Sequence, residues 1–232
     1  MRMTQAYPHI KDNLEAVRAR IASALSHAGR SQQETQLIAV SKKFSEELIR
    51  EAYLSGQKHF GENYVQEATN KIDKLSDLPL EWHFIGPIQS NKTGQIATKF
   101  DWVHSVDRLK IAQRLSQARS ASGSSLKICL QVNITEEESK QGCSVADLVE
   151  LAQSVERLPN LEFRGLMTMP RAKASNQDIV DTFRRLAELK NALNQEGLKL
   201  DVLSMGMSDD LEIGIQEGAT FVRVGRGIFG NR

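Results

Sequence analysis

The stretch LIAVSK, residues 37–42, places a lysine shortly after a run of four apolar residues. Such a run, bounded by polar residues, indicates a buried strand, so Lys42 would stand at the mouth of an apolar core. Desolvation disfavours the ammonium form, and an amine in this position can lose its proton near neutral pH and condense with an aldehyde. The stretch therefore favours a Schiff-base lysine, although a solvated charge at the end of a strand gives the same pattern.

Outside this stretch, short β-rich runs alternate with helical periodicity along the chain. An opening helix is predicted over residues 8–28, because apolar residues recur there at spacings of three and four before Gly29. Strands are predicted at 36–41, 58–62, 81–86, 101–106, 126–134, 161–168, 201–206 and 220–225. This alternation is typical of parallel strands joined by right-handed crossovers.

The number of strands decides between an open sheet and a closed barrel. Eight strands favour the α/β class fold of a (β/α)8 TIM-type barrel. Because the chain stops soon after its eighth strand, we expect the N-terminal helix to close the outer ring in place of a full eighth helix. No Gly/Ser-rich or Pro-rich linker divides the chain, so residues 1–232 are predicted to form a single domain.

Composition excludes several classes of function. The 232 residues carry 30 Lys and Arg against 29 Asp and Glu, which leaves no net field to hold a nucleic acid. No apolar run is long enough for a signal peptide or a membrane span, so a cytoplasmic protein is expected. Cys129 and Cys143 lack CxxC spacing, so neither a disulfide framework nor a metal site is predicted and both thiols should be inert.

The last two predicted strands are followed by the stretches SMGMSDD, residues 204–210, and RVGRG, residues 223–227. Loops after strands seven and eight of such barrels are the usual phosphate site, where backbone N–H groups and hydroxyls surround the oxyanion. The residues that fit this role are Gly206, Ser208, Gly225 and the N–H of Arg226. Glycines that only make turns would give the same pattern.

Three acidic residues stand where helices are predicted to begin. Asp209 and Asp210 would repel an anion at a helix start unless they turned away, so they are predicted to cap the following helix. Asp107 stands just before helical residues and is predicted to be an N-cap. A phosphate at strand seven would then meet Ser208 or backbone.

Lys42 and the predicted phosphate-binding loops after strands seven and eight would face each other across the mouth of one barrel. A ligand with an aldehyde at one end and a phosphate at the other would bridge them. Pyridoxal 5'-phosphate (PLP) is such a ligand, and a sugar phosphate bound as a Schiff base would also span the gap.

At this point the motifs resemble those of the pyridoxal phosphate homeostasis protein family over nearly the whole chain. The matching stretches are AVSK at 39–42, FGENYVQE at 60–67, WHFIG at 82–86, QSNK at 89–92, SMGMSDD at 204–210 and VRVG at 222–225. The resemblance implies a barrel of the alanine-racemase type that binds PLP as a Schiff base on Lys42. It also implies a cytosolic protein of vitamin B6 balance without a well-established catalytic reaction.

Carried over position by position, the resemblance implies that Ser208, Gly225 and Arg226 hold the phosphate and that Asn63 lies beside the cofactor. Arg223 matches the arginine that faces the pyridine nitrogen in the related racemases. Because a guanidinium can only donate hydrogen bonds, it leaves that nitrogen unprotonated and weakens PLP as an electron sink.

Other positions are less informative. A threonine often stands in the family where this chain has Arg226, so the backbone contact to phosphate is expected and a hydroxyl contact is not. Lys140 matches a family lysine near the mouth, and a solvated loop charge fits it equally. Strand alternation gives His83 a structural place in or against the barrel wall, and no role is assigned to His59 or His104.

The resulting hypothesis is a monomeric, non-catalytic PLP carrier or regulator that passes the cofactor to PLP-dependent apo-enzymes. Two alternatives stay open. One is a PLP-dependent enzyme resembling an amino-acid racemase, although racemases of this type look to need a second domain and a dimer partner. The other is a Schiff-base sugar-phosphate lyase of the class I aldolase kind, which predicts no bound chromophore.

Overall fold

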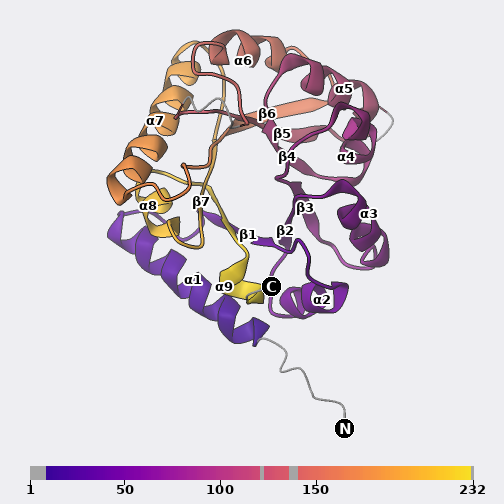
Figure 1. Ribbon diagram of the computed structural model, residues 1–232, viewed down its shortest axis with the longest axis vertical. Helices are drawn as coiled ribbons and strands as arrows, with labels where there is room; N and C mark the ends of the chain where they lie inside the picture. Colours follow the sequence, from indigo (N-terminus) through magenta and orange to yellow (C-terminus); the bar gives the residue numbers. More distant parts are fainter. Residues whose placement is uncertain (1–8, 121–122, 136–140, 231–232) are drawn as a thin grey trace.

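Eight parallel strands form a closed barrel in the order β1 to β8 within residues 9–120, 123–135 and 141–230, which this computed structural model describes (Figure 1). Their bounds are β1 Gln36–Val40, β2 His59–Glu62, β3 Glu81–Phe84, β4 Trp102–Val106, β5 Leu126–Gln131, β6 Leu161–Met167, β7 Val202–Met207 and β8 Phe221–Val224. The barrel closes where β1 pairs with β8, for example Ile38 with Arg223. The predicted barrel and its eight strands are therefore confirmed.

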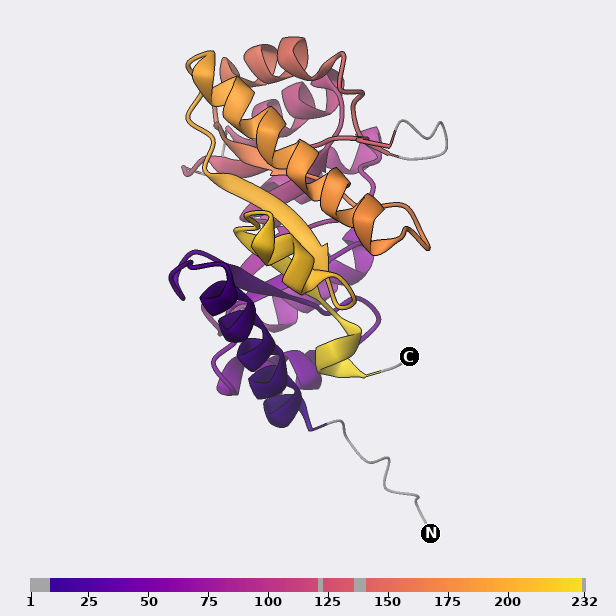
Figure 2. The ribbon, with the colours of Figure 1, turned by 90° about the vertical axis from the view of Figure 1, so that its left-hand side faces the viewer.

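Helices surround the barrel and follow the strands in turn (Figure 1). Their bounds are α1 Ile10–His27, α2 Glu46–Leu54, α3 Val65–Lys74, the 3-10 turn η1 Ser90–Lys92, α4 Thr93–Lys99, α5 Leu109–Arg119, α6 Leu148–Glu156, α7 Asn176–Gln195, α8 Leu211–Gln216 and α9 Arg226–Phe229. Helix α9, which follows the last strand, is only four residues long. Helix α1 lies next to it and packs against α8, α9 and α2 (Figures 1 and 2). The prediction that the N-terminal helix completes the outer ring is confirmed.

Helix α1 takes this place because of its apolar stripe. Ile10, Leu14, Val17 and Ile21 recur at helical spacing and are buried on one face. Gly227 of α9 packs against this stripe, since a Cβ there would lie 3.4 Å from Cγ2 of Val17. The first and last elements of the chain thus share one packed layer.

One end of β5 differs from its prediction. The predicted strand ran to residue 134, whereas β5 ends at Gln131. Beyond it, the N–H of Asn133 donates to the carbonyl of Cys143 at 2.9 Å, and the N–H of Cys143 donates to the carbonyl of Gln131 at 2.8 Å. The loop at Cys143 therefore occupies backbone N–H and C=O groups through which a longer β5 would pair with a neighbouring strand.

Apolar side chains fill two regions. The larger lies between the strands and the helices, and the smaller cluster comes from strands β1 and β4 to β8. This smaller cluster consists of Ile38, Trp102, Cys129, Met167, Val202 and Phe221. Burial raises the pKa of the Cys129 thiol well above its usual range and that of Cys143 to about 12, as expected for inert thiols.

A line of polar side chains also crosses the barrel between the strands. Nδ1 of His59 lies 3.1 Å from Nε2 of His83, and Nδ1 of His83 lies 2.9 Å from Nε2 of His104. Nδ1 of His104 lies 2.8 Å from Oγ of Ser204, which accepts a hydrogen bond from Arg223 at 2.7 Å. His83 therefore lies in the barrel interior, where it joins a chain of hydrogen bonds rather than standing alone.

No helix among the residues with assigned positions is long and apolar enough to cross a membrane.

The predicted cap at Asp107 is wrong, because Arg108 holds the N-cap position of α5. The Asp107 carboxylate instead accepts a hydrogen bond from the Arg108 guanidinium at 2.6 Å.

Candidate functional site

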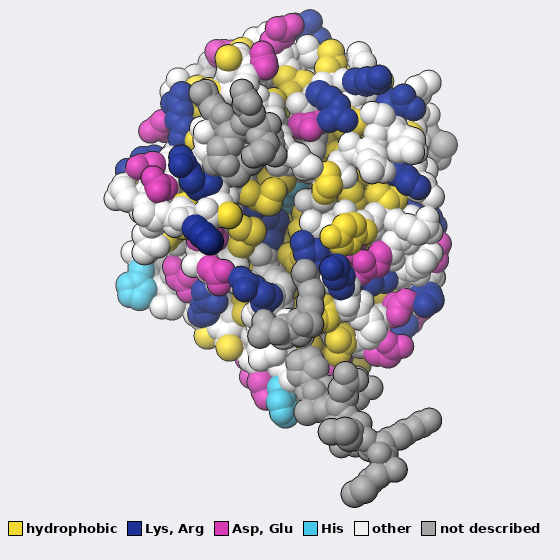
Figure 3. Space-filling model, viewed as in Figure 1, with side chains coloured by type: hydrophobic (Ala, Val, Ile, Leu, Met, Phe, Trp, Pro, Cys, Tyr) yellow, Lys and Arg dark blue, Asp and Glu magenta, His cyan; other side chains and the backbone are white. Residues whose placement is uncertain are grey.

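The polar residues that follow the strands come together at one end of the barrel. Figure 3 shows this face hollowed at its centre, with hydrophobic side chains and Lys and Arg side chains around the hollow. Lys42 lies in the turn directly after β1 and is partly buried. The next residue, Lys43, has φ of 66°, so the backbone reverses sharply behind Lys42. The turn holds the Lys42 backbone at the rim of the barrel.

The loop after β8 packs against the end of β1. A Cβ on Gly225 would lie 3.2 Å from the carbonyl oxygen of Val40 and 3.4 Å from its Cβ, so the loop approaches β1 in a way that a side chain would obstruct. Val40 stands two residues before Lys42. The loop after β8 therefore lies beside the end of β1, two residues before Lys42, although 183 positions separate Gly225 from Lys42 in the sequence numbering.

The turn after β7 is anchored from the N-terminal helix. Arg20 of α1 donates to the carbonyl of Ser208 at 2.9 Å and to both carboxylate oxygens of Glu212 at 2.7 and 2.9 Å. This pairing lowers the pKa of the Glu212 carboxyl. Arg20 thus fixes the backbone that presents Ser208 and leaves the serine hydroxyl outside this contact.

Of the two aspartates predicted to cap the helix after this turn, Asp210 holds the N-cap position of α8 and Asp209 does not. The Asp209 carboxylate accepts a hydrogen bond from the Arg226 guanidinium at 2.7 Å, in a largely exposed pair that joins the turns after β7 and β8. The Asp210 carboxylate accepts a hydrogen bond from the backbone N–H of Met207, three residues earlier in the chain, and not from an N–H of the helix. Burial raises the pKa of the Asp210 carboxyl.

Gly206, predicted to contact phosphate, lies inside β7 with φ of 90°. A Cβ there would lie 3.2 Å from Cγ1 of Val222 and 3.4 Å from Cα of Leu211. The glycine therefore allows α8 to pack closely on β7. Lys140 lies outside the described residues.

Arg223 is the buried cation of the site. Its side chain leaves β8 and donates to Oγ of Ser204 at 2.7 Å and to the carbonyl of Thr168, just after β6, at 3.0 Å. Burial lowers the pKa of the guanidinium to about 10, so it remains protonated at neutral pH. Strands β6, β7 and β8 together hold a fixed positive charge between them.

Asn63 follows β2 and carries an unsatisfied group. Its Oδ1 is buried and has no hydrogen-bond partner among the described residues. Buried polar atoms are normally paired, so such an orphan suits a contact with a ligand. The backbone of Asn63 is held by Gly86 after β3, where a Cβ would lie 2.1 Å from the Asn63 carbonyl oxygen.

The close approach at Gly86 gives a first prediction. Gly86→Ala is expected to lower the free energy of unfolding by about 1–3 kcal/mol, because the new methyl must push the end of β2 away. Urea denaturation measures the loss. Gly94→Ala in α4 is the matched control, since a Cβ there meets nothing within 4 Å and alanine favours a helix. Equal stability of the two variants would contradict this account of Gly86.

Charged residues without an assigned role in the sequence analysis support the Lys42 turn. Lys71 of α3 is buried and donates to Oε1 of Glu62 at 2.8 Å, to Oε1 of Glu67 at 2.6 Å and to the carbonyl of Ser41 at 2.8 Å. Oε1 of Glu62 also accepts the Ser41 hydroxyl at 2.7 Å. The residue before Lys42 is thus fixed by a buried ion pair.

A cavity of about 640 Å³ opens beside the ends of β5, β6 and β7. Its lining includes Asn133, Met169, Asn176 and Asp210. Asn133 stands two residues after the end of β5. The cavity lies at the same end of the barrel as the Lys42 turn.

Some contacts of the candidate site left no clear sequence signal. Ser204 and Thr168 hold Arg223 only because strands β6, β7 and β8 are aligned in register. The Glu67 and Lys71 pair has the four-residue spacing of a helical ion pair, which could have been noticed. Its burial could not have been read from that spacing.

Comparisons with known proteins agree with this architecture. Residues 13–232 match the family described as "Alanine racemase, N-terminal domain". A protein of Pseudomonas aeruginosa named pyridoxal phosphate homeostasis protein is 55% identical over 223 residues, which cover 96% of each chain. The solved structure of PipY from Synechococcus elongatus with PLP bound has a TM-score of 0.86 at 38% identity and covers 96% of this chain and 100% of PipY.

A more distant likeness concerns the fold alone. An alanine racemase of Clostridium difficile superposes with a TM-score of 0.75 at 12% identity. The match covers 95% of this chain but 57% of the racemase chain. The near full-length identity to a named homeostasis protein, together with the barrel and its strand-end residues, shows that the chain belongs to the pyridoxal phosphate homeostasis protein family.

Proposed function

We propose that this protein binds PLP as a Schiff base on Lys42 and acts in intracellular PLP homeostasis as a non-catalytic carrier or regulator. The observation that carries the proposal is the contact between Gly225 and Val40, which brings the loop after β8 beside the Lys42 turn. An amine and a loop suited to phosphate then stand together at one mouth. PLP carries an aldehyde and a phosphate on one small ring and fits both. PLP bound by PipY, a family member, supports the same assignment.

Each residue of the site has a proposed task. Lys42 supplies the amine, while the Ser208 hydroxyl and the backbone at Gly225 and Arg226 take the phosphate. Arg20 supports this cup by holding the Ser208 carbonyl, so that the turn does not need the ligand to keep its shape. The Arg226 side chain is already paired with Asp209, which leaves its backbone N–H as the group that meets phosphate.

The residues present fit PLP chemically. Oδ1 of Asn63, which has no partner in the described part of the chain, offers a polar contact beside the ring, and Arg223 offers a fixed donor for the pyridine nitrogen. When bound, PLP supplies an electron sink, whose strength depends on protonation of that nitrogen. Burial lowers the pKa of Arg223 only to about 10, so its guanidinium stays protonated at neutral pH. It can therefore donate a hydrogen bond to the pyridine nitrogen, and it leaves that nitrogen unprotonated. This arrangement restrains carbanion chemistry.

The carrier role is supported by the relative that this chain matches over nearly its whole length. The protein named pyridoxal phosphate homeostasis protein matches over 96% of both chains, whereas the match to the racemase covers 57% of the racemase chain. Racemisation needs acid and base groups on both faces of the substrate. An open mouth also admits water to the bound cofactor, which favours exchange over catalysis.

Turnover and delivery measurements test the proposal. The PLP-loaded protein is expected to convert L- and D-amino acids at rates far below about 1 s⁻¹, while restoring activity to a PLP-dependent apo-enzyme. Lys42→Ala, treated with the same PLP and then desalted, is the control and should restore none. Steady amino-acid turnover at about 1 s⁻¹ or above would identify an enzyme and refute the carrier role.

A further inference from the structure

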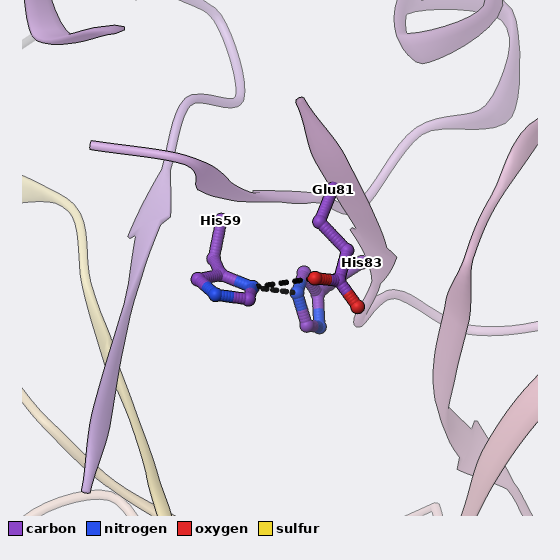
Figure 4. Close-up of side chains that lie close together, drawn as sticks. All are labelled: His59, Glu81 and His83. Atoms are coloured by element: carbon purple, nitrogen blue, oxygen red, sulfur yellow. Dashed lines mark hydrogen bonds and ion pairs between the residues drawn. The ribbon is translucent and has the colours of Figure 1, made fainter. Parts of the chain in front are cut away.

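At the opposite end of the barrel, a second cavity of about 420 Å³ opens where the strands begin. His59 and Glu81 line it, and His83 lies directly behind them. Figure 4 shows the three side chains converging on one point from neighbouring strands β2 and β3. Strand register explains the convergence, because His59 pairs with Glu81 and His83 stands two residues further along the same face of β3.

We propose that His59, Glu81 and His83 form a binding site for a divalent transition-metal ion of the Zn²⁺ type. Nδ1 of His59 lies 3.1 Å from Nε2 of His83 and 3.4 Å from Oε2 of Glu81, and the ligand atoms of all three lie within 4.8 Å of one another. Tetrahedral Zn²⁺ with bonds of about 2.0–2.2 Å holds neighbouring ligand atoms roughly 3.3–3.6 Å apart. Two histidines and one carboxylate are a ligand set that zinc uses, with a further position open to water.

The carboxylate is already oriented for this role. Oε1 of Glu81 accepts hydrogen bonds from Nε1 of Trp102 at 2.6 Å and from Nζ of Lys127 at 3.2 Å. Oε2 is the oxygen that faces His59. These outer contacts fix the ligand orientation, as the surroundings of metal sites do.

His83 has a partner on its other ring nitrogen. If Nε2 binds the ion, Nδ1 carries the proton and donates to Nε2 of His104, 2.9 Å away. His104 then donates from Nδ1 to the Ser204 hydroxyl, which can accept this bond together with the one from Arg223 because it has two lone pairs. The hydrogen-bond line across the barrel can therefore support the ligand tautomer.

Two positive groups lie near the site: Arg164 is neutralised by other acidic residues, and Lys127 pairs with the carboxylate oxygen of Glu81 that does not face His59. Arg164 pairs with Asp201 and Glu162, and Lys127 pairs with Glu81 and lies over the Trp102 ring at 5.2 Å. The side chains of His59 and Glu81 are 22% and 31% exposed, so an ion can enter from the cavity without opening the barrel. The site is independent of the proposed function, because it lies at the other end of the barrel from Lys42.

Titration of the full-length protein with Co²⁺, a spectroscopic substitute for Zn²⁺, tests the site. Tetrahedral Co²⁺ absorbs at longer wavelengths than a PLP Schiff base, so PLP-loaded protein can be used. One Co²⁺ per chain is expected to give these bands, and Zn²⁺ should displace them. His59→Ala is expected to weaken binding by at least about 100-fold, since even loss of an outer contact costs about 10–100-fold.

Matched variants make the result decisive. Glu81→Gln keeps an oxygen for Trp102 but removes the charge, and it should also weaken binding. The double variant His9→Ala/His27→Ala removes the two histidines outside the barrel and should bind Co²⁺ as the wild type does. Circular dichroism confirms that each variant is folded. Absence of the bands in the wild type, or equal binding by folded His59→Ala, would overturn the proposal.

Discussion

Lys42→Ala is expected to be colourless after incubation with PLP and desalting, whereas the wild type becomes yellow. The reason is that only a Schiff base on an amine retains the shifted absorption of PLP through removal of the free cofactor. Lys42 is partly buried in the turn after β1, beside the Gly225 loop. A visible spectrum measures the difference, and the expected effect is complete loss of the band.

Borohydride reduction identifies the lysine in the same experiment. Reduction makes the Schiff base permanent, so peptide mapping of the wild type should find the adduct on the peptide that contains Lys42. Lys43→Asn is the matched control, because it removes the neighbouring amine while asparagine tolerates the left-handed backbone at φ of 66°. This variant should stay yellow.

Two kinds of result would contradict the assignment. An adduct on another lysine, or an unchanged band in Lys42→Ala, would move the Schiff base away from β1. A wild-type protein that stays colourless with added PLP would reject PLP and return the sugar-phosphate hypothesis to first place. Either result would leave the metal site untouched, since its Co²⁺ readout depends on His59.

The barrel could be predicted from the sequence because its signals are local. Residues 37–40 are apolar and bounded by polar positions, and the other predicted strands are short β-rich runs separated by segments with helical periodicity. The largest error came at β5, where the residues after Gln131 keep a strand-like pattern. Only the returning loop at Cys143, which takes up the backbone groups of Gln131 and Asn133, ends the strand.

The site was less accessible to sequence reasoning because its contacts join distant strands. Lys42, Ser208 and Gly225 follow motifs that can be read locally, and their places at one end of the barrel agree with the strand order. The partners of Arg223 and the grouping of His59 with Glu81 depend on register between strands. Asp209 shows the same limit, since its position suggested a cap but its partner is Arg226, 17 residues away.

Lys71→Met is expected to lower the free energy of unfolding by about 3–5 kcal/mol at neutral pH, because it leaves the carboxylate of Glu62 buried without its cation. The Glu62 side chain is fully buried, and that of Lys71 is 5% exposed. Urea denaturation measures the loss. Lys74→Met, one turn further along α3, is the control, since Lys74 is largely exposed and its pair with Glu46 contributes at most about 1 kcal/mol.

The pH dependence of this variant separates a lost ion pair from poor packing of the methionine. Burial already raises the pKa of the Glu62 carboxyl, while Lys71 opposes that rise. Without Lys71 the folded protein holds a proton on Glu62 at a pH where the unfolded chain does not. Stability then increases as pH falls from 7 towards the unfolded carboxyl pKa of about 4.3, because the folded state binds more protons there. A loss in Lys71→Met that stays constant relative to the wild type over this range would show that packing, and not the charge of Glu62, supports the Lys42 turn.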